Sequence, residues 1–333
     1  MAPSVCDSVL LSSALQRFSE AASGNTAMTL HIDTPLLESQ PLSQHLGRRV
    51  LLKMDALQPP GSFKIRGIGY AAEEHAQRGK RRFVSSSGGN AGIAVAYAGR
   101  ALSIPVTVVV PQSTGERAKE LIRLQGADVI VHGATWQEAN AFALEQVGPD
   151  DAFIHPFDDP LLWHGHASMI DEVVRAGAKF DAVVLSVGGG GLMAGAIEGL
   201  RRNGLGHVPL IAVETEGASS LAQSVRAGQR IELPGITSVA TSLGAKQVCE
   251  QAFMLTQTHP VECVVVSDKE AVDASRRFVD DHRVLVEPAC GASLALVYRQ
   301  TEALQRFESV LVIVCGGAAT TIEQLERWHR EMA

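Results

Sequence analysis

Short β-branched runs alternate with longer amphipathic stretches from about residue 83 to the carboxyl terminus. This alternation is typical of a largely parallel β-sheet with helices on both faces, so an α/β fold is expected. The predicted strands are Phe83–Ser86, Thr107–Val110, Asp128–Val131, Ala182–Val187, Leu210–Glu214, Val261–Val266 and Val310–Val314. The predicted helices are Ala91–Leu102, Glu116–Gln125, Trp136–Val147, Ala194–Arg202, Lys269–Asp281, Ala292–Leu304 and Ile322–Met332.

Two clusters of turn-forming residues divide this pattern: Gln58-Pro59-Pro60-Gly61 and His155-Pro156-Phe157-Asp158-Asp159-Pro160. A chain of 333 residues is also longer than a single hydrophobic core normally supports. We therefore expect two domains, each with an open, twisted, mostly parallel sheet flanked by helices. The predicted parts are an N-terminal extension (1–27, poorly ordered), a large domain (28–55 and 159–333) and a small domain (56–158) inserted in the large one.

Composition and charge exclude several functional classes. The chain is 46% hydrophobic and 20% charged, as in ordinary globular enzymes. Its net charge of −7 provides no basic surface for nucleic acid. No apolar run reaches the roughly 18 residues that a membrane span requires. An odd number of cysteines without a CxxC pair argues against disulfides or zinc and favours a reducing, cytoplasmic compartment; these are Cys6, Cys249, Cys263, Cys290 and Cys315.

One lysine is placed for covalent chemistry. In Gly61-Ser62-Phe63-Lys64-Ile65-Arg66-Gly67 it stands between two bulky apolar residues, and flanking glycines allow close approach of backbone or ligand. Apolar surroundings lower the pKa of a lysine, which can then form a Schiff base with an aldehyde cofactor or a carbonyl substrate. A lone lysine is more often a surface residue at a helix start. The glycine-rich motifs at 85–92, 188–191 and 315–317 favour the chemical interpretation.

Four consecutive glycines, Gly188 to Gly191, follow an apolar strand and open a helix. The free backbone N–H groups and the helix dipole at such a junction bind a phosphate, whereas a simple turn would need only one glycine. The alternative is a dinucleotide site, because Gly189-x-Gly191-x-x-Ala194 fits that fingerprint and Glu214 follows about twenty residues later. A nicotinamide oxidoreductase is therefore the rival class.

The segment Ser85-Ser86-Ser87-Gly88-Gly89-Asn90-Ala91-Gly92 also joins a strand to a helix, and it suits a second anion such as a substrate carboxylate. The alternative is an ordinary helix cap. Cys315 ends a strand at the sheet edge where ligands bind, although a core cysteine is the usual role. Glu287 either starts a helix before Pro288 or faces the site, and the sequence does not decide. His164 and His166 lack metal-ligand spacing.

Together the motifs SFKIRG, SSxGNAG, FDDP, SVGGGGL, VEPACGA and VCGG resemble the pyridoxal-phosphate enzymes of fold type II, the tryptophan-synthase-β fold. Within these the chain is most similar to the serine dehydratases of the serine/threonine dehydratase family. The resemblance runs from Leu30 to the final helix, about nine-tenths of the chain.

The resemblance implies a role for each matched position. Lys64 binds the cofactor covalently and later takes the substrate Cα proton, while Phe63 packs against the cofactor ring. The substrate carboxylate is expected at Ser87, Gly88, Gly89, Asn90 and Ala91, and Asn90 also hydrogen-bonds the ring hydroxyl. The phosphate is expected at Gly188, Gly189, Gly190, Gly191 and Leu192.

Two positions distinguish branches of the resembled family. Cys315 matches the residue opposite the pyridine nitrogen, where relatives acting on other substrates usually carry serine or threonine. A neutral partner there makes the ring a weaker electron sink. Gly88 stands where serine racemases of this fold have an acid serine and liver-type serine dehydratases often have alanine. We expect extra room at Gly88, which could admit threonine.

The resemblance also implies a cation near the phosphate loop, potassium or another hard ion. Its ligands would be Glu214, Ala218, Ser220, Leu243 and Ala245. The implied protein is a homodimeric lyase that converts L-serine to pyruvate and ammonia and, as a second reaction, L-threonine to 2-oxobutanoate. The alternatives are a threonine dehydratase, a serine racemase, an NAD-dependent oxidoreductase and a non-catalytic amino-acid-binding regulator.

Overall fold

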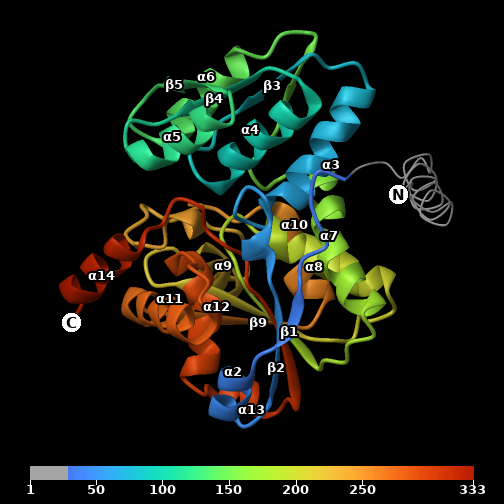
Figure 1. Ribbon diagram of the computed structural model, residues 1–333, viewed down its shortest axis with the longest axis vertical. Coiled ribbons are helices and arrows are strands. Elements are labelled where there is room, and N and C mark those ends of the chain that lie inside the picture. The colour runs from blue at the N-terminus through green and yellow to red at the C-terminus, as the bar shows by residue number, and fades with distance from the viewer. Residues whose placement is uncertain (1–28) are drawn as a thin grey trace, which may run out of the picture.

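The computed structural model describes residues 29–333, and the predicted extension at 1–27 lies outside the described residues. Its strands form two sheets (Figure 1). The larger sheet has the order β1-β2-β10-β7-β8-β9 and the smaller one β5-β4-β3-β6. The strands are β1 (Leu36–Glu38), β2 (Arg49–Lys53), β3 (Arg82–Ser85), β4 (Val106–Val110), β5 (Asp128–Val131), β6 (Asp151–Phe153), β7 (Ala182–Ser186), β8 (Leu210–Thr215), β9 (Val261–Val266) and β10 (Ser309–Ile313).

Helices follow most strands. They are α2 (Gln40–Leu46), α3 (Lys64–Gln77), α4 (Asn90–Leu102), α5 (Glu116–Leu124), α6 (Trp136–Glu145), α7 (Pro160–Arg175), α8 (Gly191–Arg202), α9 (Ser220–Ala227), α10 (Glu250–Thr258), α11 (Asp268–His282), α12 (Pro288–Tyr298), α13 (Glu302–Gln305) and α14 (Ile322–Glu331). None of the helices in the described part of the chain combines the length and apolar composition needed to cross a bilayer.

Both sheets are parallel except at one edge, where β1 pairs antiparallel with β2. The strands β4, β7 and β8 are buried throughout, as expected when helices cover both faces of a parallel sheet. In the smaller sheet side chains alternate between the faces: Phe83 and Val108 belong to a cluster with α4, and Val84 and Val109 to a cluster with α6. Because the strands other than β1 are parallel within their sheets, their carboxyl ends lie at one edge of each sheet.

The helices α3 and α7 pack closely where the upper and lower parts of the molecule meet in Figure 1. A Cβ atom on Gly67 of α3 would lie 2.5 Å from the carbonyl oxygen of Leu162, and one on Gly165 of α7 would lie 2.4 Å from that of Arg66. Only glycine permits this approach. The contact fixes the position of α3, whose first residue is Lys64.

A buried ionic cluster links α3 to α7 and to the segment around β2. Arg66 is fully buried and donates to both carboxylate oxygens of Asp55 at 2.6 and 2.8 Å and to Glu172 at 2.5 and 2.9 Å. Lys53 of β2 also pairs with Glu172. Burial opposes the charge on Arg66, yet the two carboxylates raise its pKa, so the guanidinium stays charged.

The sequence-based element predictions agree closely with this fold. All seven predicted strands are present with ends within one residue of those expected, while β1, β2 and β6 were not predicted. The predicted helix Ala292–Leu304 is wrong as one element, because Gln300 adopts φ 52° between α12 and α13. The domain boundaries at 56 and 158 stay a prediction, although all strands of the smaller sheet lie between them.

Candidate active site

Three loops that follow the carboxyl ends of strands converge on the start of α3. They leave β3, β7 and β10, so both sheets contribute. Backbone contacts hold Lys64 close to Cys315. The N–H of Phe63 donates to the carbonyl oxygen of Cys315 at 3.0 Å, and Ser62 forms an isolated antiparallel β-bridge with Gly316. Residues that are 250 positions apart in the sequence therefore form one site.

The amine of Lys64 is largely shielded from solvent. Its Nζ donates to the carbonyl oxygen of Pro156 at 2.6 Å and lies 5.2 Å from the centre of the Phe63 ring. Burial lowers the pKa of Lys64 to about 8, and the nearby Glu287 carboxylate acts in the opposite direction. A useful fraction of the amine is thus neutral and nucleophilic near neutral pH, as the sequence predicted.

The tetraglycine loop offers a row of backbone hydrogen-bond donors. None of the backbone N–H groups of residues 188–193 donates to another residue of the described chain. Gly190 has φ 94°, which turns the loop into α8 in a conformation that favours glycine. Several free N–H groups at the start of a helix form an anion site of the kind that binds a phosphate.

Neighbouring residues close the space around this loop. A Cβ on Gly189 would lie 2.2 Å from the ring of Phe157, and one on Gly188 would lie 2.9 Å from the carbonyl oxygen of Ser242. Phe157 belongs to the motif FDDP, and Ser242 to the short turn before Gly244. The glycines are therefore needed for packing as well as for binding.

The loop after β3 is a second donor site. The N–H groups of Ser87, Gly88, Asn90, Ala91 and Gly92 find no acceptor among the described residues, and no side chain caps α4. A Cβ on Gly92 would lie 1.8 Å from the carbonyl oxygen of Ser87, so this turn requires glycine. The alternative of a helix cap by Ser87 or Asn90 is thereby excluded.

The extra room expected beside Gly88 is not empty. A Cβ added to Gly88 would lie 2.5 Å from Cγ2 and 2.7 Å from Oγ1 of Thr114. The expectation of free space is wrong because Thr114, in the loop after β4, fills it. Sequence reasoning did not single out Thr114, and only the fold brings it to this place.

The side chains of Asn90 and Glu287 form a buried pair. Nδ2 of Asn90 donates to Oε1 of Glu287 at 2.8 Å, and Oδ1 of Asn90 accepts from the N–H of Ala318 at 3.1 Å. Glu287 directly precedes Pro288, the first residue of α12. Both sequence interpretations of Glu287 are therefore right: it starts the helix and its carboxylate faces the site.

Cys315 is buried beside a second thiol. It is 6% exposed, and its hydrogen bond with Cys290 together with burial raises its pKa well above the ordinary value. The thiol is therefore neutral, as the sequence analysis expected at this position. In the described chain Cys249, Cys263, Cys290 and Cys315 are all free.

Of the residues expected to bind a cation, Glu214 belongs to β8, and Ala218 and Ser220 follow this strand directly. Glu214 is fully buried, its oxygens accept the N–H groups of Leu221 and Ala222 at 2.8 and 2.7 Å, and burial raises its pKa to about 7. The nearby hydroxyl of Ser220 is buried without a partner. Within residues 29–333 no three His, Cys, Asp or Glu side chains form a metal cluster. A cation here would therefore depend on carbonyl oxygens.

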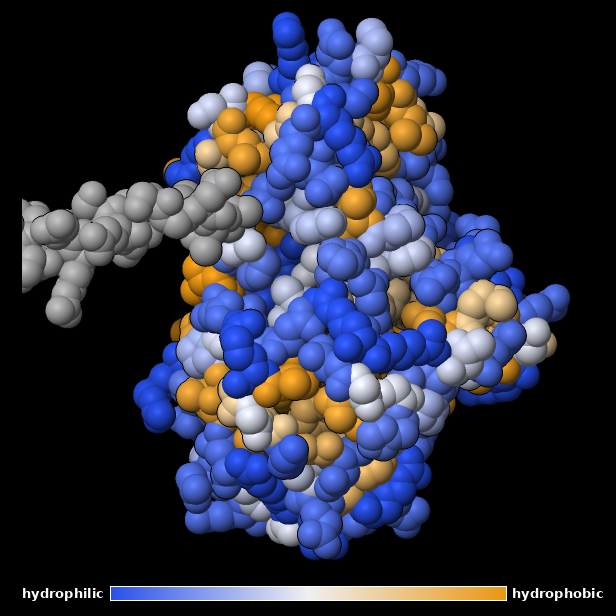
Figure 2. Space-filling model, turned by 90° about the vertical axis from the view of Figure 1, so that its right-hand side faces the viewer, coloured by the Kyte–Doolittle hydropathy of each residue, from blue (hydrophilic) through white to orange (hydrophobic). Residues whose placement is uncertain are grey.

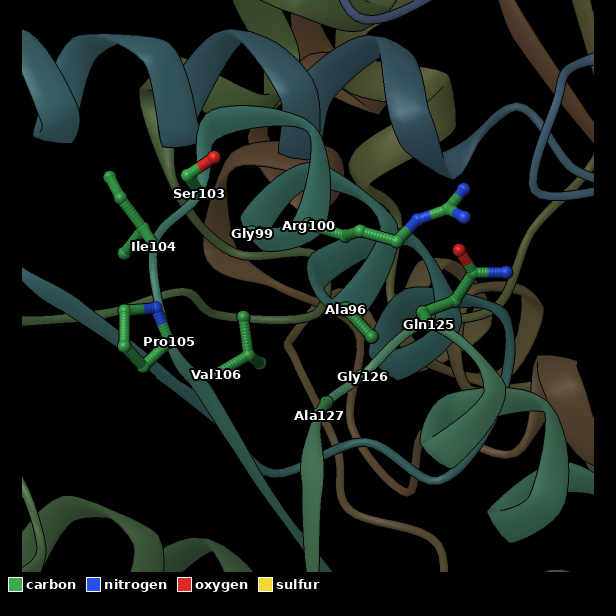
Figure 3. A pocket seen from close by; sticks show the side chains of 10 residues that line it. All are labelled: Ala96, Gly99, Arg100, Ser103, Ile104, Pro105, Val106, Gln125, Gly126 and Ala127. Carbon is green, nitrogen blue, oxygen red and sulfur yellow. The ribbon is translucent and has the colours of Figure 1, made fainter.

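The two histidines that the sequence analysis singled out lie in different surroundings. His164 is paired with Glu198 at 2.8 Å, and His166 is buried against the Phe63 ring, with ring centres 4.9 Å apart. A pocket of about 220 Å³ lies between the carboxyl end of α4, the start of β4 and the loop that joins α5 to β5 (Figure 3). Arg100 is the only charged side chain among the described residues that line it. Its residues come from the far end of α4 and the amino end of β4, which excludes it as the reaction site.

Comparison with known proteins decides the family. A family model described as "Pyridoxal-phosphate dependent enzyme" matches residues 18–316. The chain belongs to the pyridoxal-phosphate dependent enzymes. It is 48% identical to the "L-serine dehydratase/L-threonine deaminase" of Mus musculus over 90% of this chain and 94% of that protein. It is 44% identical to the "L-serine dehydratase" of Dictyostelium discoideum over 92% and 94% of the two chains.

Solved structures agree with this assignment. A fungal L-serine ammonia-lyase from Rhizomucor miehei superimposes with a TM-score of 0.87 at 35% identity and covers 91% of this chain and 99% of its own. A processed threonine deaminase from Solanum lycopersicum gives a TM-score of 0.81 at 28% identity, covering 91% and 84%. The predicted fold, PLP fold type II, is confirmed.

The site fits pyridoxal phosphate and not a dinucleotide. A partly neutral lysine can bond to an aldehyde, and the free N–H groups of residues 188–193 can receive one phosphate. Glu214 has no exposed surface, so it is not accessible to the ribose of a dinucleotide. The dehydrogenase alternative is therefore excluded.

Proposed function

We propose that this pyridoxal-phosphate enzyme is an L-serine ammonia-lyase, which converts L-serine to pyruvate and ammonia, and that it also converts L-threonine to 2-oxobutanoate. The names of the similar mammalian and Dictyostelium proteins support both the reaction and the two substrates. The observation that carries the proposal is the buried Lys64 amine between two separate anion sites. One anion site would bind the carboxylate of an amino-acid substrate, and the other would bind the phosphate of the cofactor.

We infer that Lys64 is the catalytic residue. Its Nζ would hold the cofactor in the resting enzyme and, once free, would take the proton from Cα of the substrate. The lowered pKa of Lys64, about 8, suits a base that works near neutral pH. The carbonyl oxygen of Pro156, now 2.6 Å away, can hold the amine in place while it carries the proton. When bound, the cofactor stabilises the negative charge that develops at Cα.

Further residues would hold the cofactor and the substrate. Asn90 would bond the ring hydroxyl, Phe63 would pack on the ring and the neutral thiol of Cys315 would face the ring nitrogen. The phosphate would be received by Gly188, Gly189, Gly190, Gly191 and Leu192. The substrate carboxylate would be received by the N–H groups of Ser87, Gly88, Asn90 and Ala91, with Gly89 at the helix cap.

We also propose a monovalent cation bound by Glu214 and by oxygens of Ala218, Ser220, Leu243 and Ala245. The unpaired hydroxyl of Ser220 and the buried carboxylate without an ion-pair partner support it.

A homodimer in the cytoplasm and the domain division at 56 and 158 remain further proposals. Sedimentation of the purified protein tests the homodimer, and limited proteolysis near residues 56 and 158 tests the domain division.

Assays of ammonia and 2-oxo acid release test the proposed reaction. With the purified protein and added cofactor, we expect pyruvate from L-serine and slower 2-oxobutanoate from L-threonine. Lys64→Ala should abolish both products. Ammonia from L-threonine alone would make the protein a threonine dehydratase, and formation of D-serine without ammonia would make it a racemase.

A further inference from the structure

The carboxylate of Glu287 lies among the residues around Lys64, yet the proposed reaction gives it no role. The side chain is buried, at 9% exposure. Four segments that are distant in sequence meet there: the loop after β3 with Asn90, the turn with Ser242, the start of α12 and the loop after β10 with Gly317. Such convergence on one buried carboxylate calls for a physical explanation.

Helix capping does not explain this carboxylate. Glu287 is the residue before α12, but its side chain makes no capping hydrogen bond. The backbone of Glu287 caps the helix instead, because its carbonyl oxygen accepts hydrogen bonds from the N–H groups of Cys290 and Gly291 at 2.9 Å each. The carboxylate points instead to Asn90.

Ion pairing does not explain it either. In the part of the chain that the structure describes, Glu287 takes part in no salt bridge, and Lys64 is the cation whose charge acts on it. A buried carboxylate without an ion pair destabilises a folded protein. Carboxylates of this kind are found preferentially at functional sites.

The glycine-rich loop after β10 is shaped to accommodate the Glu287 side chain. Gly317 has φ 138°, and a Cβ at this position would lie 2.4 Å from Cγ of Glu287. Any larger residue would push the carboxylate away from Asn90. This contact accounts for the second glycine of the Cys315-Gly316-Gly317 motif.

The hydrogen bonds of Asn90 show what the carboxylate does. Its Oδ1 accepts from Ala318 and one hydrogen of Nδ2 is donated to Glu287, so the amide cannot flip without losing both bonds. The second Nδ2 hydrogen remains for another acceptor, and the hydroxyl of Ser242 is only a distant one at 3.5 Å. A bond to an ionised acceptor is stronger than one to a neutral group.

We propose that Glu287 is a positioning residue, whose carboxylate holds the Asn90 amide so that its second hydrogen is donated to the ring hydroxyl of pyridoxal phosphate. The inference rests on the proposed role of Asn90 in cofactor binding and adds a residue that acts through it. Burial raises the pKa of Glu287 to about 7, while bonds from Ser242 and Asn90 lower it. A part of the Glu287 population is thus ionised near neutral pH.

The test measures cofactor binding without substrate, in Glu287→Ala and Glu287→Gln variants of the full chain. Fluorescence titration gives the dissociation constant of pyridoxal phosphate, and the visible spectrum reports the electronic state of the bound ring. We expect roughly tenfold weaker binding and a shifted visible band for Glu287→Ala, the size of one lost bond to a charged group. Glu287→Gln keeps the shape and one acceptor, so its change should be smaller.

A double-mutant cycle separates positioning from a general structural effect. In an Asn90→Ala background, Glu287→Gln should cause no further change in affinity or spectrum. Glu270→Gln, which alters the capping residue of α11 outside the site, serves as the control and should behave like the unmodified protein. Circular dichroism confirms that each variant is folded.

Two results would overturn the inference: an unchanged affinity and spectrum in Glu287→Ala, or an undiminished effect of Glu287→Gln when Asn90 is absent. These outcomes are independent of the proposed reaction, because no substrate is added. A protein that binds the cofactor at Lys64 but releases no ammonia from L-serine would contradict the proposed function and leave the role of Glu287 intact.

Discussion

The backbone N–H of Phe63 donates a 3.0 Å hydrogen bond to the carbonyl oxygen of Cys315. This bond joins the residue before the reactive lysine to the residue expected opposite the cofactor nitrogen. It places Lys64 beside a neutral thiol and at the edge where β10 ends. Figure 2 shows a face on which hydrophilic side chains predominate and hydrophobic residues form separate patches. Lys64 is half-buried, in contrast to the usual surface lysine.

Capture of the cofactor by the apoprotein should report the lowered pKa of Lys64. Only the neutral amine attacks an aldehyde, so the rate of capture should rise with pH and level off above a pH of about 8. An ordinary exposed lysine would keep gaining reactivity up to its reference pKa of about 10.4. Stopped-flow absorbance at a series of pH values makes the measurement. A rate that still rises steeply well above pH 8 would contradict the burial of this amine.

The variant Gly189→Ala should impair cofactor binding. The added methyl group would lie 2.2 Å from the Phe157 ring, so the ring or the glycine loop must move. Overpacking of this kind costs about 1–3 kcal/mol, and we expect roughly tenfold weaker binding of pyridoxal phosphate. Gly235→Ala is a matched control, since a Cβ there meets no atom within 4 Å. Equal affinities of the two variants would show that the loop does not bind the phosphate.

The variant Gly88→Ala tests whether Thr114 limits the substrate pocket. The new methyl group would displace the Thr114 side chain, 2.5 Å away, toward the substrate. We expect kcat/KM for L-threonine to fall more than that for L-serine, with a change of roughly tenfold in their ratio. Adding Thr114→Ala removes both clashing atoms, Cγ2 and Oγ1, and should restore the ratio. Gly115→Ala, with open space at its Cβ, is the control. A ratio that does not move would mean that Gly88 lies away from the substrate side chain.

The variant Arg66→Met should destabilise the protein by about 3–5 kcal/mol, because it leaves Asp55 and Glu172 buried without their shared cation. The exposed i,i+4 pair of Arg78 and Glu74 provides a control, and Arg78→Ala should cost less than about 1 kcal/mol. Urea unfolding monitored by tryptophan fluorescence compares both with the unmodified chain. Equal losses for the two variants would contradict a stabilising role of the buried cluster.

The sequence predicts the strands that are long and rich in β-branched residues, since their pattern is unambiguous. It does not predict β1 and β6, which have only three residues each, or β2, whose two flanking basic residues, Arg49 and Lys53, interrupt the apolar pattern. Lys53 is buried there because Glu172 of α7 neutralises it. A partner from a distant helix is not visible in a local pattern.

The site residues that belong to local motifs are also predictable. Lys64, the tetraglycine loop and the loop with Asn90 are each recognised from neighbouring residues. Thr114 and the orientation of Glu287 are not, because both depend on contacts across more than twenty positions of sequence. The space beside a glycine in particular is decided by whichever residue the fold places there.

Covalent trapping tests the central claim most directly. The purified protein is loaded with pyridoxal phosphate, reduced with borohydride to make the lysine linkage permanent, digested and mapped by mass spectrometry. We predict the label on the peptide that contains Lys64, and no label in Lys64→Ala. A label on another lysine, or none at all, would contradict the account.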